Sequence, residues 1–379
     1  MILDHQLAQQ IVDRTMSIIG YNINVMNHAG IIIGSGESQR LGQVHDGAIL
    51  ALKHGDSIEL TEESCRSLKG VKPGINMLLQ SNEQVVGILG ITGEPNDIRE
   101  FANLVKMTAE MIIDQADLVE KLQWDRRHRE EFITAWVNNE LSVQELESWA
   151  GKLSIDIMQP RVAVVIQFRD QETPKSLQSI RKLVDLLEYP QRDNLVAIIS
   201  MNEIVVLKPC QSVAQWDSQI ESQRIDKLLA RLGENQIDGF DIALGQLFES
   251  PWQIHRSYQS AKQVLQTGRA HQPKRNKHLF EELRLPVLLS PLADFWQGEQ
   301  LMNAMDKLER KDKSGQLVKT LDALFKANGS VSECSKLLFV HRNTLRYRLD
   351  KISEITGIST SDFVGLTELY IARQISKVR

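Results

Sequence analysis

The chain has 379 residues, of which 42% are hydrophobic and 25% are charged, as is typical of a globular protein with two or three domains. Its 44 Lys and Arg and 49 Asp and Glu give a net charge of −5. No apolar run is long enough for a membrane helix and no signal-peptide core is present, so we expect a cytoplasmic protein without a membrane partner. Cys65, Cys210 and Cys334 are far apart and lack metal-ligand spacing, so we expect buried thiols and no metal.

Residues 1–135 predict a sensor domain. A short helix within residues 1–20 is followed by hairpins at 22–34 and 74–92, with a helix near 44–53 between them. A long helix then runs from Pro95 toward Arg129. Two hairpins around a central helix favour a PAS-like or GAF-like fold, which binds small ligands against its sheet.

Residues 136–280 show the order of a small α/β domain. The expected elements are a strand at 161–168, a helix at 176–187, a hairpin at 194–209, a helix at 216–232, a strand at 241–244 and a helix at 257–267. This order predicts a mainly antiparallel sheet with helices on one face. Residues 268–279 are interpreted as an exposed loop.

Residues 281–379 predict an all-α domain that contains a helix-turn-helix. Ser330 and Glu333 have the spacing of a capping box that begins the first helix of the pair. Cys334 lies where a small residue lets two helices approach each other. The second helix begins near His341 and ends at Gly357, and its apolar stripe consists of Leu345, Leu349, Ile352 and Ile355.

The opposite face of this second helix carries side chains suited to reading DNA. Arg bonds guanine and Asn bonds adenine through two hydrogen bonds each, so we expect Arg342, Asn343 and Arg346 to contact bases. Phosphate contacts are assigned to His341, Thr344, Tyr347 and Arg348. The alternative is an ordinary amphipathic helix with a solvated basic face.

Charge favours the DNA-binding interpretation. Residues 311–379 hold 12 Lys and Arg against 7 Asp and Glu, a net charge of +5, whereas residues 1–310 carry −10. A two-fold operator needs two reading helices, so we expect a homodimer or higher homo-oligomer on double-stranded DNA.

Three blocks of sequence resemble the carbohydrate diacid regulator family (CdaR type). They are residues 21–48 with 70–95, residues 194–209 with 243–265, and LLFVHRNTLRYRLDKISEITGI at residues 337–358. The resemblance implies a sugar-diacid sensor, a degenerate GGDEF-like domain and a PucR-type helix-turn-helix. It also implies an activator of genes for uptake and catabolism of glucarate, galactarate and glycerate.

An enzyme is the alternative that the middle domain must exclude. A diguanylate cyclase carries Gly-Gly-Asp/Glu-Glu-Phe at the tip of the second hairpin, where this chain has Ser200-Met201-Asn202-Glu203-Ile204. Both glycines and the acid before Glu203 are missing, so we expect a non-catalytic relay or dimerisation domain with no catalytic residues and no cofactor.

A sugar diacid needs cationic or N–H donors for its carboxylates and small polar side chains for its hydroxyls. The resemblance to a diacid sensor therefore directs attention to eight residues: Asn24, Ser35, Arg40, His45, Lys72, Gly74, Asn76 and Thr92. The amides between Gly70 and Gly74 are a candidate anion nest. Turn chemistry alone also explains these glycines, and a lone His45 is more often structural. A different effector, such as a purine catabolite, remains the alternative ligand.

Overall fold

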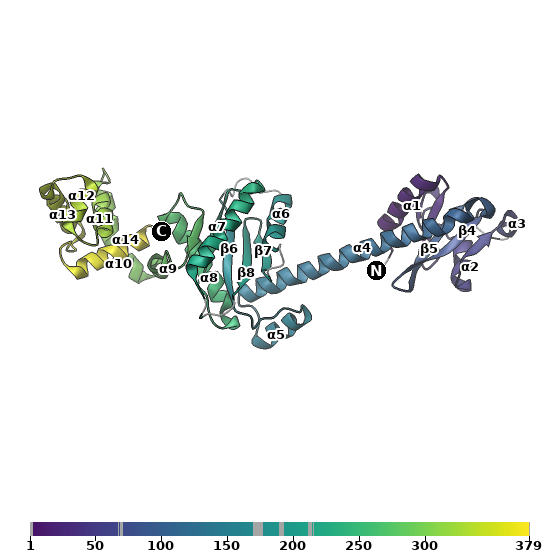
Figure 1. The fold of residues 1–379 in the computed structure, drawn as a ribbon, viewed down its shortest axis with the longest axis horizontal. Helices are drawn as coiled ribbons and strands as arrows, with labels where there is room; N and C mark the ends of the chain where they lie inside the picture. The colour runs from purple at the N-terminus through teal and green to yellow at the C-terminus, as the bar shows by residue number, and fades with distance from the viewer. Residues whose placement is uncertain are drawn as a thin grey trace. The chain divides into compact units, whose positions relative to one another are not determined.

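The computed structural model describes residues 3–66, 68, 71–169, 177–188, 193–210, 214 and 216–378. It divides into two compact units, residues 1–127 and 128–379. In the described residues each unit contains one five-stranded sheet together with helices, which confirms the predicted mixed α+β class (Figure 1). Among these residues no helix is both long and apolar enough to cross a membrane.

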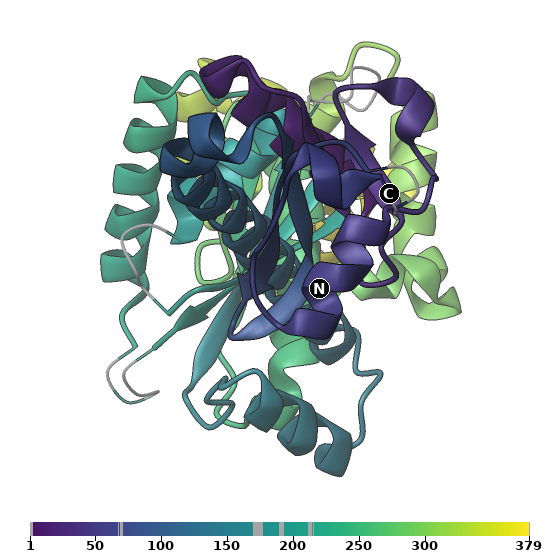
Figure 2. The ribbon, with the colours of Figure 1, turned by 90° about the vertical axis from the view of Figure 1, so that its right-hand side faces the viewer.

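The first unit, drawn in purple and blue in Figure 2, is built on an antiparallel sheet with strand order β2-β1-β5-β4-β3. Both predicted hairpins are confirmed. The short β3 and α3 lie outside the prediction, because three or four residues carry too little periodicity. The bounds are β1 Ile23–Met26, β2 Ile32–Ser35, β3 Ile58–Leu60, α3 Glu62–Cys65, β4 Gly74–Ser81 and β5 Gln84–Thr92.

Helices cover both faces of this first sheet. Alternate residues of the strands pack against α1 (His5–Ile19) and the first part of α4 (Pro95–Val137). The opposite face, which includes Met26 and Ile88, packs against α2 (Asp46–His54). The sheet is therefore the middle of three layers, with α1 and α4 on one face and α2 on the other.

The sheet of the second unit has the order β10-β9-β6-β8-β7. The predicted order of strands and hairpin is confirmed, but the prediction of an exposed loop over residues 268–279 is partly wrong. Helix α8 continues to His271, and residues 277–279 form a strand parallel to β9. A strand of only three residues gives almost no signal in the sequence. The bounds are β6 Arg161–Phe168, β7 Leu195–Ser200, β8 Glu203–Pro209, β9 Phe240–Leu244 and β10 Lys277–Leu279.

The expectation that helices cover only one face of this second sheet is wrong. Apolar side chains of α5 and α8 and of the end of α4 pack on the face that carries Ala163 and Val165. Side chains of α6 and α7 pack on the face that carries Val164 and Ile166. Every residue of β6 except Gln167 is buried, as both faces require. The helices are α5 Val143–Lys152, α6 Leu177–Glu188, α7 Ser218–Glu234 and α8 Ile254–His271.

The remaining residues of the second unit form helices, as predicted. Apolar side chains of the helices from α10 to α14 pack into one core, in which Leu321, Cys334 and Leu345 are fully buried. The bounds are α9 Arg284–Leu289, α10 Trp296–Lys311, α11 Gln316–Lys326, α12 Val331–Leu338, α13 Arg342–Thr356 and α14 Phe363–Ser376.

Candidate ligand site and DNA-reading helix

A row of polar positions crosses the α2 face of the first sheet. Ser35, Asn24, Gly90 and Asn76 are paired in succession across β2, β1, β5 and β4. Asn24 and Asn76 are only 1% and 3% exposed, and the Ser35 hydroxyl donates to Asn24 Oδ1 at 2.7 Å. Burying polar groups costs free energy unless they are hydrogen-bonded, so such a row inside an apolar sheet needs an explanation.

Asn76 provides the clearest sign that this row is incomplete. Its buried Oδ1 has no hydrogen-bond partner. An orphaned buried carbonyl oxygen costs about 1–3 kcal/mol, which a donor such as a ligand hydroxyl would recover. Asn76 therefore has an acceptor oxygen that is unused within the protein.

His45 joins this site from the start of α2. It is the N-cap of the helix, and its Nδ1 accepts from the Ala48 amide at 3.2 Å, which leaves Nε2 as the N–H donor. Burial first, and then the charge of Arg40, lowers the pKa of His45 to about 4. At neutral pH the side chain is therefore a neutral hydrogen-bond donor that also caps a helix.

Arg40 is the buried cation among the predicted ligand residues. It ends the short helix η1 (Ser38–Arg40) and is only 8% exposed. The predicted residues Asn24, Ser35, Arg40, His45 and Asn76 are thus all buried, and the three on strands lie in one row.

The other predicted ligand residues differ in their surroundings. Lys72 is about half exposed and pairs with Glu37 at 2.7 Å, so it links the segment before β4 to the segment before η1. Thr92 pairs with Gly74 at the end of the strands that carry Gly90 and Asn76. A Cβ at Gly74 would lie 2.0 Å from the Ile91 carbonyl oxygen, so strand packing explains this glycine. Gly70 of the candidate anion nest lies outside the described residues.

Two glycines of the site were not identified from the sequence. A Cβ at Gly90 would lie 2.9 Å from Asn76 Oδ1, and a Cβ at Gly47 would lie 3.1 Å from Asn76 Nδ2. Both glycines therefore keep space free around the Asn76 amide. A glycine inside the strand of residues 84–92 was the available signal, because strand glycines often mark a close approach.

In the middle domain, the carboxylate of the hairpin residue Glu203 is hydrogen-bonded to two neighbouring side chains. Its carboxylate accepts from Gln167 Nε2 at 3.2 Å and from the Tyr258 hydroxyl. Burial and then this hydrogen bond raise the pKa of Tyr258. Gln167 pairs with Glu203 on one side and with Asp241 on the other, so these three residues form a row across the sheet.

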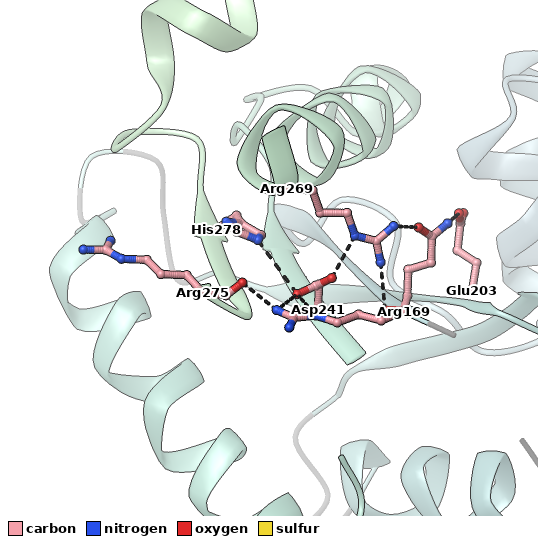
Figure 3. Close-up of polar contacts among 7 residues, drawn as sticks. Arg169, Glu203, Asp241, Arg269, Arg275 and His278 are labelled. Carbon is pink, nitrogen blue, oxygen red and sulfur yellow. Dashed lines mark hydrogen bonds and ion pairs between the residues drawn. The ribbon is translucent and has the colours of Figure 1, made fainter. Parts of the chain in front are cut away.

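Two arginines occupy the other end of this row (Figure 3). Arg169 donates from Nε and Nη2 to Asp241 Oδ1 at 2.9 and 2.6 Å, and Arg269 donates from Nε to Asp241 Oδ2 at 2.8 Å. Burial alone would raise the pKa of Asp241, but the two arginine hydrogen bonds lower it overall. Both carboxylate oxygens are therefore satisfied within the protein.

Arg269 also links Asp241 to the middle residue of the row. It donates from Nη1 to Gln167 Oε1 at 2.5 Å. Within the described ranges no group of three or more His, Cys, Asp or Glu side chains is placed to hold a metal.

The predicted helix-turn-helix is present as α12, a tight turn and α13. Ser330 caps α12 by accepting from the Glu333 amide at 3.3 Å. The reciprocal half of the expected capping box is not formed, because the Glu333 carboxylate binds Lys336 instead. In the turn, Phe339 adopts a left-handed conformation with φ of 52° and is 96% exposed.

The second helix begins and ends where the sequence predicted. His341 is the N-cap and accepts from the Asn343 amide, and Gly357 ends α13 with φ of 75°. The whole predicted stripe of Leu345, Leu349, Ile352 and Ile355 is buried.

The opposite face of α13 is open to solvent at nearly all predicted positions. The exposed residues are His341, Arg342, Asn343, Thr344, Arg346 and Tyr347. Arg348 differs, because it is half-buried and donates from Nη2 to Gln316 Oε1 at 3.0 Å. It braces α13 against α11, so its side chain is less available for a phosphate than the other six.

Three family models match the chain in succession. "Putative sugar diacid recognition" matches residues 3–136, "GGDEF-like domain" residues 138–267, and "PucR C-terminal helix-turn-helix domain" residues 317–375. The "Carbohydrate diacid regulator" of Escherichia coli (strain K12) is 40% identical over 100% of this chain and 99% of its own length.

Two further relatives extend the comparison. An "Uncharacterized protein" of Haemophilus influenzae is 37% identical over 98% of both chains. The "DNA-binding transcriptional activator AdeR" of Bacillus subtilis (strain 168) is 29% identical over 55% of this chain and 50% of its own. A diacid-recognition domain, a GGDEF-like domain and a helix-turn-helix in this order place the chain in the class of transcription regulators. Within this class, the chain belongs to the carbohydrate diacid regulator family.

Proposed function

We propose that this protein is a ligand-responsive activator of genes for the uptake and catabolism of sugar diacids such as glucarate, galactarate and glycerate. In this proposal residues 1–135 sense the diacid, residues 136–280 relay without catalysis, and residues 281–379 bind DNA. The proposed sensor is PAS-like or GAF-like, with the ligand bound between α2 and the sheet.

The unpartnered Asn76 Oδ1 is the observation that carries the ligand assignment. Asn76 would accept from a ligand hydroxyl, while Asn24 and Ser35 extend the polar row. The Arg40 guanidinium and the neutral His45 would bind a carboxylate near the start of α2, where the helix dipole favours negative charge. Thr92 and Gly74 pair with each other two residues further along β5 and β4, beside this row.

The Lys72–Glu37 ion pair forms the rim of this proposed site. Both side chains are more than a third exposed, and ion pairs of this kind contribute at most about 1 kcal/mol. Opening the rim to admit a ligand therefore costs little. In the open state Lys72 would also attract a dianion.

For DNA, we propose that Arg342, Asn343 and Arg346 read bases. His341, Thr344, Tyr347 and, more weakly, Arg348 would contact phosphates. The exposed, cationic N-terminal half of α13, opposite its buried stripe, supports these roles.

Fluorescence anisotropy with promoter fragments of diacid catabolism genes tests the DNA-binding roles. Replacing Arg346 by Ala should weaken specific binding by about 10- to 100-fold, as expected for one base contact of 1–3 kcal/mol. Lys351→Ala is the matched control, because Lys351 lies on the same helix and pairs with Glu354. The control should bind within about twofold of the wild type.

A thermal-shift screen of the full chain against sugar diacids and purine catabolites identifies the effector class. Stabilisation by a diacid, combined with a change in promoter affinity, supports the proposal. A response to purines alone would mean that the protein is a regulator of the same architecture that senses a purine catabolite instead of a diacid. Unchanged DNA binding by Arg346→Ala together with no response to any diacid would exclude the proposed function.

A further inference from the structure

The long helix α4 carries two apolar stripes, although only one of them is covered. Ile98, Ala102, Val105, Ala109 and Ile112 form the first stripe and pack on the sheet of the first unit. The second consists of Phe101, Leu104, Met111, Leu118 and Leu122, which are between 44% and 65% exposed. Large apolar side chains repeated along one face in this way mark an interaction surface.

The spacing of the second stripe identifies the kind of partner. Positions 101, 104, 108, 111, 115, 118 and 122 alternate steps of three and four, which is the heptad repeat of a coiled coil. Asp97 and Asp125 occupy the next positions at the two ends, so the repeat is bounded to three heptads, about 32 Å of helix. We propose that α4 pairs with α4 of a second copy of this chain through this heptad seam.

The exposed area of the stripe is adequate for such a pair. Together with Met107, which is 61% exposed beside the seam, the five large residues expose on the order of 600 Å² per copy. A standard interface buries roughly 800 Å² per partner, and the polar and aliphatic parts of the flanking residues contribute the remainder.

Two polar residues interrupt the seam. The Thr108 hydroxyl already donates to the Leu104 carbonyl at 2.8 Å, so burying it leaves no unsatisfied donor. Gln115 lies two turns further along, on the same line of the heptad. Polar residues at such positions fix the register of a coiled coil, because in a parallel pair each faces its own copy.

The sheet of the first unit does not obstruct this pairing. Phe101, Leu104, Thr108 and Met111 each lie one position before a residue of the covered stripe, so the two stripes are about 100° apart around the helix. Two-fold symmetry then puts the two sheets on opposite flanks of the paired helices. The parallel orientation rests on the proposed function, because it brings the residues after α4 of both copies to the same end for a two-fold operator.

Disulfide cross-linking tests the seam and its orientation. In the full-length chain with Cys65→Ser and Cys210→Ser, Gln115→Cys should give a covalent dimer on mild oxidation. Glu120→Cys is the matched control, because Glu120 is exposed on the opposite side of α4 and should give none. A disulfide that forms only when Thr108→Cys and Gln115→Cys chains are mixed would overturn the parallel orientation.

The mass in solution tests the seam without DNA or ligand, so its failure is distinct from failure of the proposed function. Light scattering should give twice the chain mass of 43.0 kDa for the wild type. Leu104→Glu with Leu118→Glu should give the single mass and an unchanged circular dichroism spectrum, because both side chains are exposed. A monomeric wild type, or a double variant that remains dimeric, would overturn the proposal.

Discussion

The two units each bury a polar network in a five-stranded sheet, but the networks differ in how completely they are satisfied. Around Asp241, two arginines saturate both carboxylate oxygens. Around Asn76, a buried carbonyl oxygen has no partner, and two glycines keep space beside it. A fully satisfied polar network rigidifies a fold, whereas an unpaired buried polar group costs free energy until it finds a partner. This difference supports the proposal that the first domain senses the ligand and that the network in the middle domain is structural.

Breaking the closed network should have the largest effect on stability. Asp241→Ala leaves Arg169 and Arg269 buried in part without their shared carboxylate, which should cost about 3–5 kcal/mol of unfolding free energy. Urea denaturation of the second unit measures this loss. Glu249→Ala, an exposed acid on the same unit, is the control and should change stability by less than about 0.5 kcal/mol. A loss below 1 kcal/mol for Asp241→Ala would show that the network is dispensable.

Acid should destabilise the first unit through His45. Its folded pKa of about 4 lies below the usual histidine pKa of 6.5, so between these pH values the unfolded chain binds a proton that the folded chain excludes. The stabilisation is present above pH 6.5 and is lost as the pH falls toward 4, by up to about 3 kcal/mol. His45→Asn retains an N-cap acceptor and should flatten this dependence in thermal melts. Equal pH slopes for both proteins would contradict the buried neutral state of His45.

Opening one link of the closed network should have a moderate effect. Tyr258→Phe removes one of the two hydrogen bonds to Glu203 and should cost about 1–2 kcal/mol, because Gln167 still binds the carboxylate. Chemical denaturation measures the change. The folded variant should bind promoter DNA as tightly as the wild type. A loss of DNA binding without a loss of stability would instead mean that Tyr258 helps to transmit the signal through the middle domain.

The open network should respond in the opposite way. Asn76→Leu removes an oxygen that has no partner, so stability should remain within about 1 kcal/mol of the wild type. The same change should abolish the thermal shift produced by a diacid. A large loss of stability would mean that Asn76 is a structural residue and not an open acceptor.

The sequence predicted the elements with strong periodicity and the residues whose chemistry is local. The buried stripe and caps of α13 were predicted because each depends on neighbours within two turns. Asn24, Ser35 and Asn76 were chosen as diacid ligands from the family resemblance, and strand pairing does bring them into one row.

Contacts between distant segments were not predictable in the same way. The network of Arg169, Asp241 and Arg269 joins residues up to 100 positions apart, and each alone resembles a solvated charge. The strand β10 was missed because its pairing with β9, and not its composition, makes it a strand. The missing half of the capping box shows a local competition, since Lys336 takes the Glu333 carboxylate.

Isothermal titration of glucarate, galactarate and glycerate into the wild type and Asn76→Leu tests the central claim most directly. At least one diacid should bind the wild type, and Asn76→Leu should bind it at least about tenfold more weakly while remaining equally stable. Equal affinity of the two proteins, or no binding of any diacid to the wild type, would contradict the assignment of the ligand to the α2 face of the first sheet.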